Sequence, residues 1–205
     1  MVRLAEKDGF KHECSIFREH GGMMSTGQAI SSGIHPRELY AMRDTGILQR
    51  ISRGWYRLAE MPPFSDPDLV TVALKVPKGV VCLISALAFH EATTQVPHEI
   101  HLALPKGEKA PRLGHPPLRI YRFLAEAYTD GVETHIIDSV PVRIYSVEKT
   151  LADCFKFRNK IGQDVAIEAL KLSWRSKSLD LNKLMQYAHI CRVENVMRPY
   201  LETLL

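Results

Sequence analysis

The sequence predicts an α+β protein in which an N-terminal winged helix-turn-helix is followed by a mixed α/β domain with a small antiparallel sheet and helices. Three observations indicate this class. Residues 21–58 have the order of two short helices and a hairpin, the proline-rich stretch MPPFSDPD at 61–68 interrupts the chain, and β-rich runs at 100–145 give way to a helical period. We expect two domains, residues 1–62 and 63–205.

Composition and charge exclude several classes of protein. The 205 residues are 45% hydrophobic, which is enough for a hydrophobic core, and the formal charge of +4 permits an acidic partner without requiring one. The longest apolar run, at 80–89, is far shorter than the roughly 18 residues of a membrane-spanning helix. Residues 1–14 lack the continuous apolar segment of an export signal. The cysteines form no CxxC pair, which favours reduced thiols in a cytoplasmic protein.

The helix-turn-helix begins after a first amphipathic helix that we expect to end near His20. Ser25 and Gln28 have the spacing of a capping box, so they predict a short helix through Ile30 that Gly33 ends. Pro36 suits the first position of a second helix, which should end before Gly46. Two short helices separated by such a turn are typical of a DNA-binding helix pair.

The second helix should place its apolar and polar residues on opposite faces. At 100° per residue, Leu39 and Met42 point one way, and Arg37, Tyr40, Ala41 and Asp44 lie on the other side. Arginine can recognise a guanine edge, and tyrosine can contact phosphate or stack. The run at 47–58 then predicts two strands around Ser52-Arg53-Gly54, which would form the wing.

Basic residues are concentrated in this segment. Residues 34–59 carry five arginines against Glu38 and Asp44, a net +3 in 26 residues. A small helical domain with a solvated arginine face would show the same charge, but the order of helix pair, wing and basic residues favours DNA binding. The residues we expect to contact DNA are Thr26, His35, Arg37, Tyr40, Arg43, Arg50, Arg53 and Arg57.

The remaining chain predicts alternating helices and strands. Asp66-Pro67 should start a helix, and the runs at 69–76 and 80–92 read as two buried helices separated by Pro77-Lys78-Gly79. The following β-rich runs favour antiparallel pairing, and Ser146 should cap a helix with one apolar face. The expected strands are 100–105, 118–123, 133–137 and 140–146, and the further helices are 164–173, 181–189 and 194–204, the last containing Pro199.

Catalytic and metal-binding signatures are weak. Histidines 90, 98, 101 and 115 lie near Glu91 and Glu99, but no HExxH motif occurs, so we expect ordinary surface or hydrogen-bonded histidines. A metal-dependent nuclease would need an acid-x-Lys motif, whereas Glu148 and Lys149 are adjacent. Phosphate-binding loops and nucleophile elbows are also missing from the sequence. The prediction is a protein without catalytic residues, cofactor or metal.

Three segments resemble the AbiEi antitoxin family: SSGIHPRELYAMRDTGILQRISRGWYRL, IYSVEKTLADCFKFRNKIGQDVAIEALK and YAHICRVENVMRPYLETLL. The resemblance runs from about Phe10 to Leu205, and its most specific part is TLADCFKFRNKIG at 150–162. It implies a repressor that binds inverted repeats upstream of its own operon and whose C-terminal domain, residues 63–205, counters a nucleotidyltransferase-like toxin. In this type IV arrangement, antitoxin and toxin form no stable complex.

The sequence therefore predicts an autorepressing antitoxin whose partners are double-stranded operator DNA and a toxin. One alternative is a solitary winged-helix regulator whose C-terminal domain senses a ligand or dimerises. A second alternative, from a different class, is a metal-dependent DNA-processing enzyme.

Overall fold

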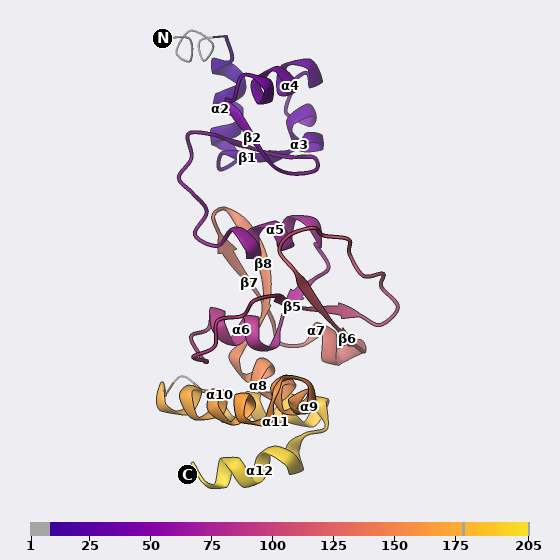
Figure 1. Ribbon diagram of the computed structural model, residues 1–205, viewed down its shortest axis with the longest axis vertical. Coiled ribbons are helices and arrows are strands. Elements are labelled where there is room, and N and C mark those ends of the chain that lie inside the picture. The colour runs from indigo at the N-terminus through magenta and orange to yellow at the C-terminus, as the bar shows by residue number, and fades with distance from the viewer. Residues whose placement is uncertain (1–8, 178, 205) are drawn as a thin grey trace. The chain divides into compact units, whose positions relative to one another are not determined.

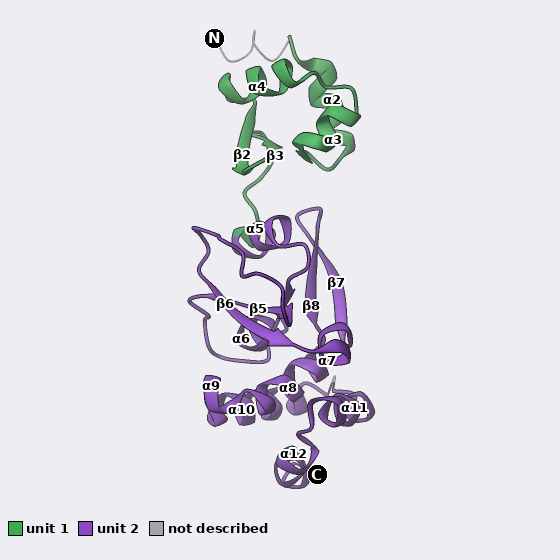
Figure 2. Ribbon diagram, turned by 90° about the vertical axis from the view of Figure 1, so that its right-hand side faces the viewer, with its two compact units in different colours: residues 1–67 green, residues 68–205 purple. Residues whose placement is uncertain are grey.

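The computed structural model describes residues 9–177 and 179–204, and these form two compact units. Unit 1 comprises residues 1–67 and unit 2 residues 68–205 (Figure 2). The division follows Pro67, the last proline of the stretch on which the sequence-based boundary was placed. Residues 1–8, which belong to the segment inspected for an export signal, lie outside the described residues. In the described part of the chain, none of the helices has the length and apolar character needed to cross a membrane.

From residue 9 on, where its description begins, unit 1 contains the helices α2, α3 and α4 and a three-stranded antiparallel sheet in the order β1-β3-β2 (Figure 1). Both predicted helices of the pair and both wing strands are present. The short strand β1, which precedes α3 and pairs with β3, was not predicted. Its three residues are too few to show the alternation of apolar and polar side chains that marks a strand. The elements are α2 (Lys11–Glu19), β1 (Met23–Ser25), α3 (Thr26–Ser31), α4 (Pro36–Asp44), β2 (Leu48–Ser52) and β3 (Trp55–Leu58).

Unit 2 is built on a five-stranded mixed sheet in the order β6-β5-β4-β8-β7. Helices α5 and α6 precede most of its strands in the chain. The elements up to the end of the sheet are α5 (Pro67–Lys75), β4 (Val80–Val81), α6 (Leu83–Phe89), β5 (Ile100–Pro105), β6 (Leu118–Phe123), α7 (Ala125–Thr129), β7 (Val132–Ile137) and β8 (Val140–Tyr145).

Two predictions about this sheet need correction. The run at 80–92 is not one helix, because Val80 and Val81 form the central strand β4 and the helix α6 starts only at Leu83. Antiparallel pairing is confirmed for the β7–β8 hairpin and holds for β4 with β5, but β5 pairs with β6 and β4 with β8 in parallel. A completely buried strand has no alternation, so its sequence resembles a buried helix.

The helices after β8 gather as a layer on one side of the sheet (Figure 2). Ser146 caps the first of them, as predicted, and accepts a hydrogen bond from the Lys149 amide at 3.3 Å. This helix, α8, contacts α6, α10 and α11. Every residue from Glu148 to Phe155 is buried, so the helix is covered on all sides and not only on the one apolar face that was predicted. The layer consists of α8 (Val147–Lys156), α9 (Arg158–Ile161), α10 (Gln163–Arg175), α11 (Leu181–Cys191) and α12 (Glu194–Glu202).

His101 is a buried titratable group in the middle of the sheet. It lies on β5 with 3% of its surface exposed, and its ring centroid is 5.3 Å from that of Tyr121. Burial lowers the pKa of His101 from its ordinary value of 6.5 to about 4, with the Arg119 charge acting in the same direction and Glu99 opposing both. The folded protein therefore holds this imidazole neutral where an exposed histidine would be protonated.

We expect His101 to make unit 2 less stable in acid. The unfolded chain protonates this imidazole as the pH falls below 6.5, whereas the folded chain protonates it only near pH 4. The free energy of unfolding therefore falls as the pH is lowered from 6.5 to 4. The full effect is on the order of 3 kcal/mol. Urea unfolding at pH 7 and pH 4.5 measures it, comparing wild type with His101→Leu and with the exposed control His98→Ala. An equal pH dependence in wild type and His101→Leu would contradict this assignment.

Candidate nucleic-acid interface

The helix pair is shaped by local hydrogen bonds that the sequence encodes. The Ser25 hydroxyl accepts from the Gln28 amide at 3.1 Å, and the Gln28 side chain accepts from the Ser25 amide at 2.8 Å, so the predicted capping box is present. At the other end of α3, Gly33 has a φ of +93°, which glycine adopts without strain. The Gly33 and Ile34 amides donate back to Ile30 and Ala29, which closes the helix.

Helix α4 begins with a second capping box. Pro36 occupies the first position, the His35 Nδ1 accepts from the Arg37 amide at 3.2 Å, and the Glu38 carboxylate accepts from the His35 amide at 3.1 Å. His35, one of the predicted DNA contacts, therefore has a structural role as the cap. Its ring is exposed, so it also lies at the surface beside the first turn of α4.

The two faces of α4 are those that the helical period predicted. Leu39 and Met42 are completely buried in the core of unit 1, together with Phe17 of α2 and Tyr56 of β3. On the opposite side Arg37 and Tyr40 are exposed, Tyr40 to 41%. The core therefore fixes the rotation of α4 and directs a polar face to solvent.

The wing is held against the start of α3. Thr26 donates to the carbonyl oxygen of Gly54 through its amide at 2.8 Å and its hydroxyl at 3.3 Å. Gly54 has a φ of +78° in the tight turn between β2 and β3, and Arg53 beside it is exposed. Arg50 is exposed on β2, and its Nε donates to the Ser52 carbonyl at 3.3 Å. Thr26, predicted as a DNA contact, joins the wing to the helix pair.

Two of the predicted arginines are engaged within the protein. Arg43 forms an ion pair with Asp44 at 2.7 Å and lies 5.2 Å from the centre of the Tyr40 ring. The hydrogen bond to Asp44 raises the pKa of Arg43. Arg57 is 7% exposed, donates to the Pro62 carbonyl, and stacks on Phe64 at 4.1 Å. The guanidinium group of Arg57 is therefore covered by the segment that follows β3, and its contact with DNA stays a prediction.

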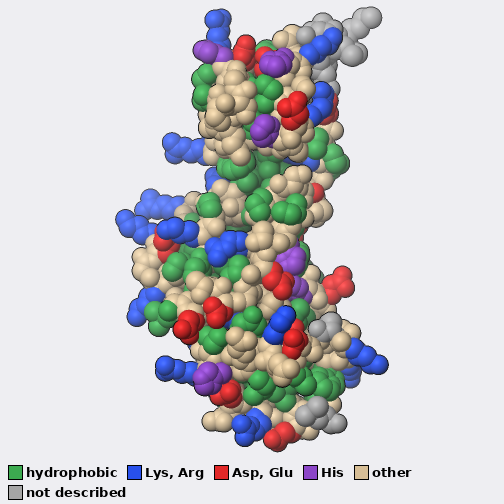
Figure 3. Space-filling model, turned by 180° about the vertical axis from the view of Figure 1, so that it is seen from behind, with side chains coloured by type: hydrophobic (Ala, Val, Ile, Leu, Met, Phe, Trp, Pro, Cys, Tyr) green, Lys and Arg blue, Asp and Glu red, His purple; other side chains and the backbone are tan. Residues whose placement is uncertain are grey.

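The exposed part of the candidate interface consists of His35, Arg37 and Tyr40 at α4 and of Arg50 and Arg53 on the wing. Surface charge alone does not distinguish it, because Lys and Arg side chains project in separate groups over the face shown in Figure 3. Gln49, adjacent to Arg50 on β2, is also exposed and was not predicted. No alternation signal marks it, because the adjacent residues Gln49 and Arg50 point to opposite faces of β2 and both are exposed.

Glu148 and Lys149, which lack the acid-x-Lys spacing of a metal-dependent nuclease, are both engaged in contacts within unit 2. Lys149 is completely buried and its Nζ lies 2.5 Å from the Asp153 carboxylate, while Glu148 is 9% exposed and accepts from the Asp180 amide at 3.2 Å. The side chains of cysteines 14, 82, 154 and 191 are buried.

The comparisons with known proteins agree with this geometry. Residues 15–59, from α2 to the end of the wing, match the family model of a transcriptional regulator, AbiEi antitoxin, which confirms the resemblance for that segment. A crystal structure of the RV2827C protein from Mycobacterium tuberculosis is similar in fold, with a TM-score of 0.58 and 13% identity over 86% of this chain and 69% of that one. No curated protein matches the chain.

Leu39→Ala should destabilise unit 1 by about 2–5 kcal/mol, because it leaves a cavity under α4. Tyr40→Ala, one position along on the exposed face, is the matched control and should change the free energy of unfolding by less than about 0.5 kcal/mol. Circular dichroism during urea unfolding measures both. Equal midpoints for the two variants would mean that the assigned rotation of α4 is incorrect.

Proposed function

We propose that the chain is a transcriptional regulator that binds double-stranded operator DNA with inverted repeats through α4 and the β2–β3 wing. The observation that carries the proposal is the geometry of unit 1. A nine-residue helix is anchored by Leu39 and Met42, presents Arg37 and Tyr40 outward, and lies in the same small core as a wing fixed to α3. A recognition helix in the major groove and a wing on the adjacent backbone require this arrangement.

We further propose that the protein is the antitoxin of a type IV system in the cytoplasm. The match of residues 15–59 to an AbiEi antitoxin regulator supports the regulatory part. The partner would be a nucleotidyltransferase-like toxin that the antitoxin counters without a stable complex and without catalysis of its own. A solitary regulator is the rival interpretation, and an adjacent nucleotidyltransferase gene would decide against it.

Arg37 and Arg53 should contribute differently to DNA binding. Arg37 lies in the first turn of α4, so Arg37→Ala should cost about 1–3 kcal/mol on the operator and relax the preference at one base pair. Arg53 lies at the turn of the wing, so Arg53→Ala should weaken specific and random DNA alike and lower the salt slope by about one unit. Fluorescence anisotropy with the upstream region of the gene and a scrambled duplex, at two salt concentrations, measures both effects.

The matched control is Arg198→Ala, which removes an exposed arginine from α12 in unit 2. It should leave affinity for both duplexes unchanged. Equal loss of discrimination in Arg37→Ala and Arg53→Ala would contradict the division between base reading and phosphate contact. Unchanged binding in both variants would remove α4 and the wing as the interface.

The two proposed activities should separate when the chain is cut after Ser65. This position keeps Phe64 with Arg57 in the N-terminal fragment and leaves α5 whole in the other. Residues 1–65 should bind operator DNA without rescuing cells from the toxin. Residues 66–205 should restore growth while leaving the promoter active, because they lack the helix pair and the wing. A growth assay beside a promoter reporter, with expression checked by blot, tests this.

Rescue by residues 1–65 alone would mean that neutralisation consists only of repressing toxin transcription. If neither soluble fragment rescues growth but the full chain does, the two units act together and the assignment of antitoxin activity to unit 2 is wrong.

A further inference from the structure

Three potential metal ligands meet in unit 2, and none of them belongs to the helix-turn-helix. His90 follows the end of α6, and Glu133 and His135 lie two residues apart on β7, so their side chains project from the same face of that strand. One ligand atom from each residue lies within 4.8 Å of those of the other two. The sequence places His90 far from the other two residues, which explains why no local spacing motif marks the group.

The two imidazole rings are held in position by contacts of their own. The ring of Phe89 lies 5.2 Å from that of His90 and 4.8 Å from that of His135, both edge to face, and the two imidazoles are 5.8 Å apart. The His90 Nε2 lies 2.8 Å from the carbonyl oxygen of Tyr145 at the end of β8. In the tautomer that donates this hydrogen bond, the lone pair is on Nδ1. Metal-binding histidines commonly donate their second nitrogen to a backbone carbonyl in this way.

We propose that His90, Glu133 and His135 form a binding site for one divalent transition-metal ion of the Zn²⁺ type. Two imidazoles and one carboxylate are a usual protein ligand set for zinc, with water completing the tetrahedron. Atoms bound to one tetrahedral ion at about 2.0–2.1 Å are roughly 3.3 Å apart, and Glu133 Oε2 and His135 Nε2 already lie 3.1 Å apart. The ligand atom of His90 lies within 4.8 Å of the other two, so it needs to approach them by up to about 1.5 Å.

The exposure of the site suits a reversibly bound ion. The side chains of His135 and Glu133 are 32% and 48% exposed, so solvent and metal can reach them. The four cysteines, which would otherwise compete for zinc, are buried, and burial raises the pKa of Cys191 to about 12. A bound ion would connect β7, an edge strand of the sheet, to the end of α6.

A simple hydrogen-bonded pair without metal is the competing explanation, and the chain supplies a control for it. His189 Nδ1 lies 3.2 Å from a Glu194 oxygen, almost the same distance as in the Glu133–His135 pair. Among the described residues, His90, Glu133 and His135 form a group of three possible metal ligands. His189 and Glu194 do not belong to such a group. His189→Ala therefore removes an exposed histidine–glutamate pair that lacks a third ligand.

The test is calorimetric titration of the untagged, chelator-treated full chain with zinc chloride. Wild type and His189→Ala should bind one ion per chain with the same affinity, and binding should raise the melting temperature. His135→Ala and the shape-preserving Glu133→Gln should weaken this binding at least tenfold, because each removes a ligand. Glu133→Gln changes an exposed side chain and should melt like wild type without zinc. Cobalt should give the visible spectrum of nitrogen and oxygen ligands without a thiolate charge-transfer band.

Equal zinc affinity in wild type, Glu133→Gln and His135→Ala would overturn the proposal, as would a thiolate band with cobalt or the absence of one-to-one binding. These results would leave the proposed DNA-binding function untouched, because the site shares no residue with α4 or the wing.

Discussion

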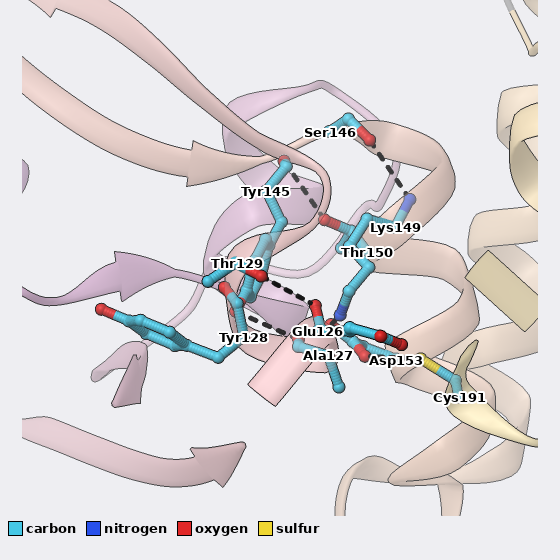
Figure 4. Close-up of polar contacts among 10 residues, drawn as sticks. All are labelled: Glu126, Ala127, Tyr128, Thr129, Tyr145, Ser146, Lys149, Thr150, Asp153 and Cys191. Atoms are coloured by element: carbon cyan, nitrogen blue, oxygen red, sulfur yellow. Dashed lines mark hydrogen bonds and ion pairs between the residues drawn. The ribbon is translucent and has the colours of Figure 1, made fainter. Parts of the chain in front are cut away.

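Unit 2 depends on an ion pair in the middle of its core. Lys149 and Asp153 are one helical turn apart on α8, both are completely buried, and their charged atoms are 2.5 Å apart (Figure 4). Transferring either charge alone into such an interior costs several kcal/mol, which the attraction between the two offsets only when the geometry is good. Burial raises the pKa of Asp153, and Lys149 and the Cys191 thiol, which donates to Asp153 at 3.2 Å, oppose that shift. Each charge can remain in the core only while its partner is there.

The neighbours of this pair come from every layer of unit 2. The Lys149 ammonium lies 4.9 Å from the Phe123 ring of β6 and 4.4 Å from the Tyr145 ring of β8, where aromatic faces favour a cation. The Tyr145 hydroxyl donates to the Tyr128 carbonyl at 2.8 Å, and the Tyr145 carbonyl accepts from Thr150 and faces His90. The network therefore extends from the core to the proposed metal ligands, so the position of His90 is set by the same strand that covers the buried charge.

Local signals were sufficient for the helix pair and the wing of unit 1 and insufficient for much of unit 2. Capping and turn chemistry act within a few residues, so Ser25, Pro36 and Gly54 predicted α3, α4 and the wing from the sequence alone. The strand β4 and the parallel β5–β6 pairing are set by contacts between distant segments, which a short run such as Val80–Val81 cannot specify. Charged residues are expected to be exposed, and for this reason the burial of Arg57 and of Lys149 was not predicted.

The packing of the candidate interface limits the number of arginines that one copy can offer to DNA. Of five arginines in residues 34–59, Arg57 is buried and Arg43 is paired with Asp44, so Arg37, Arg50 and Arg53 supply most of the exposed cationic charge. Because Arg37 is assigned to a base, Arg50 and Arg53 leave two phosphate contacts, which correspond to a salt slope of only about two, well below that of strong repressors. An operator with inverted repeats brings two such surfaces to one DNA molecule and doubles the number of contacts. The modest charge of unit 1 therefore favours recognition by two copies over tight binding by one.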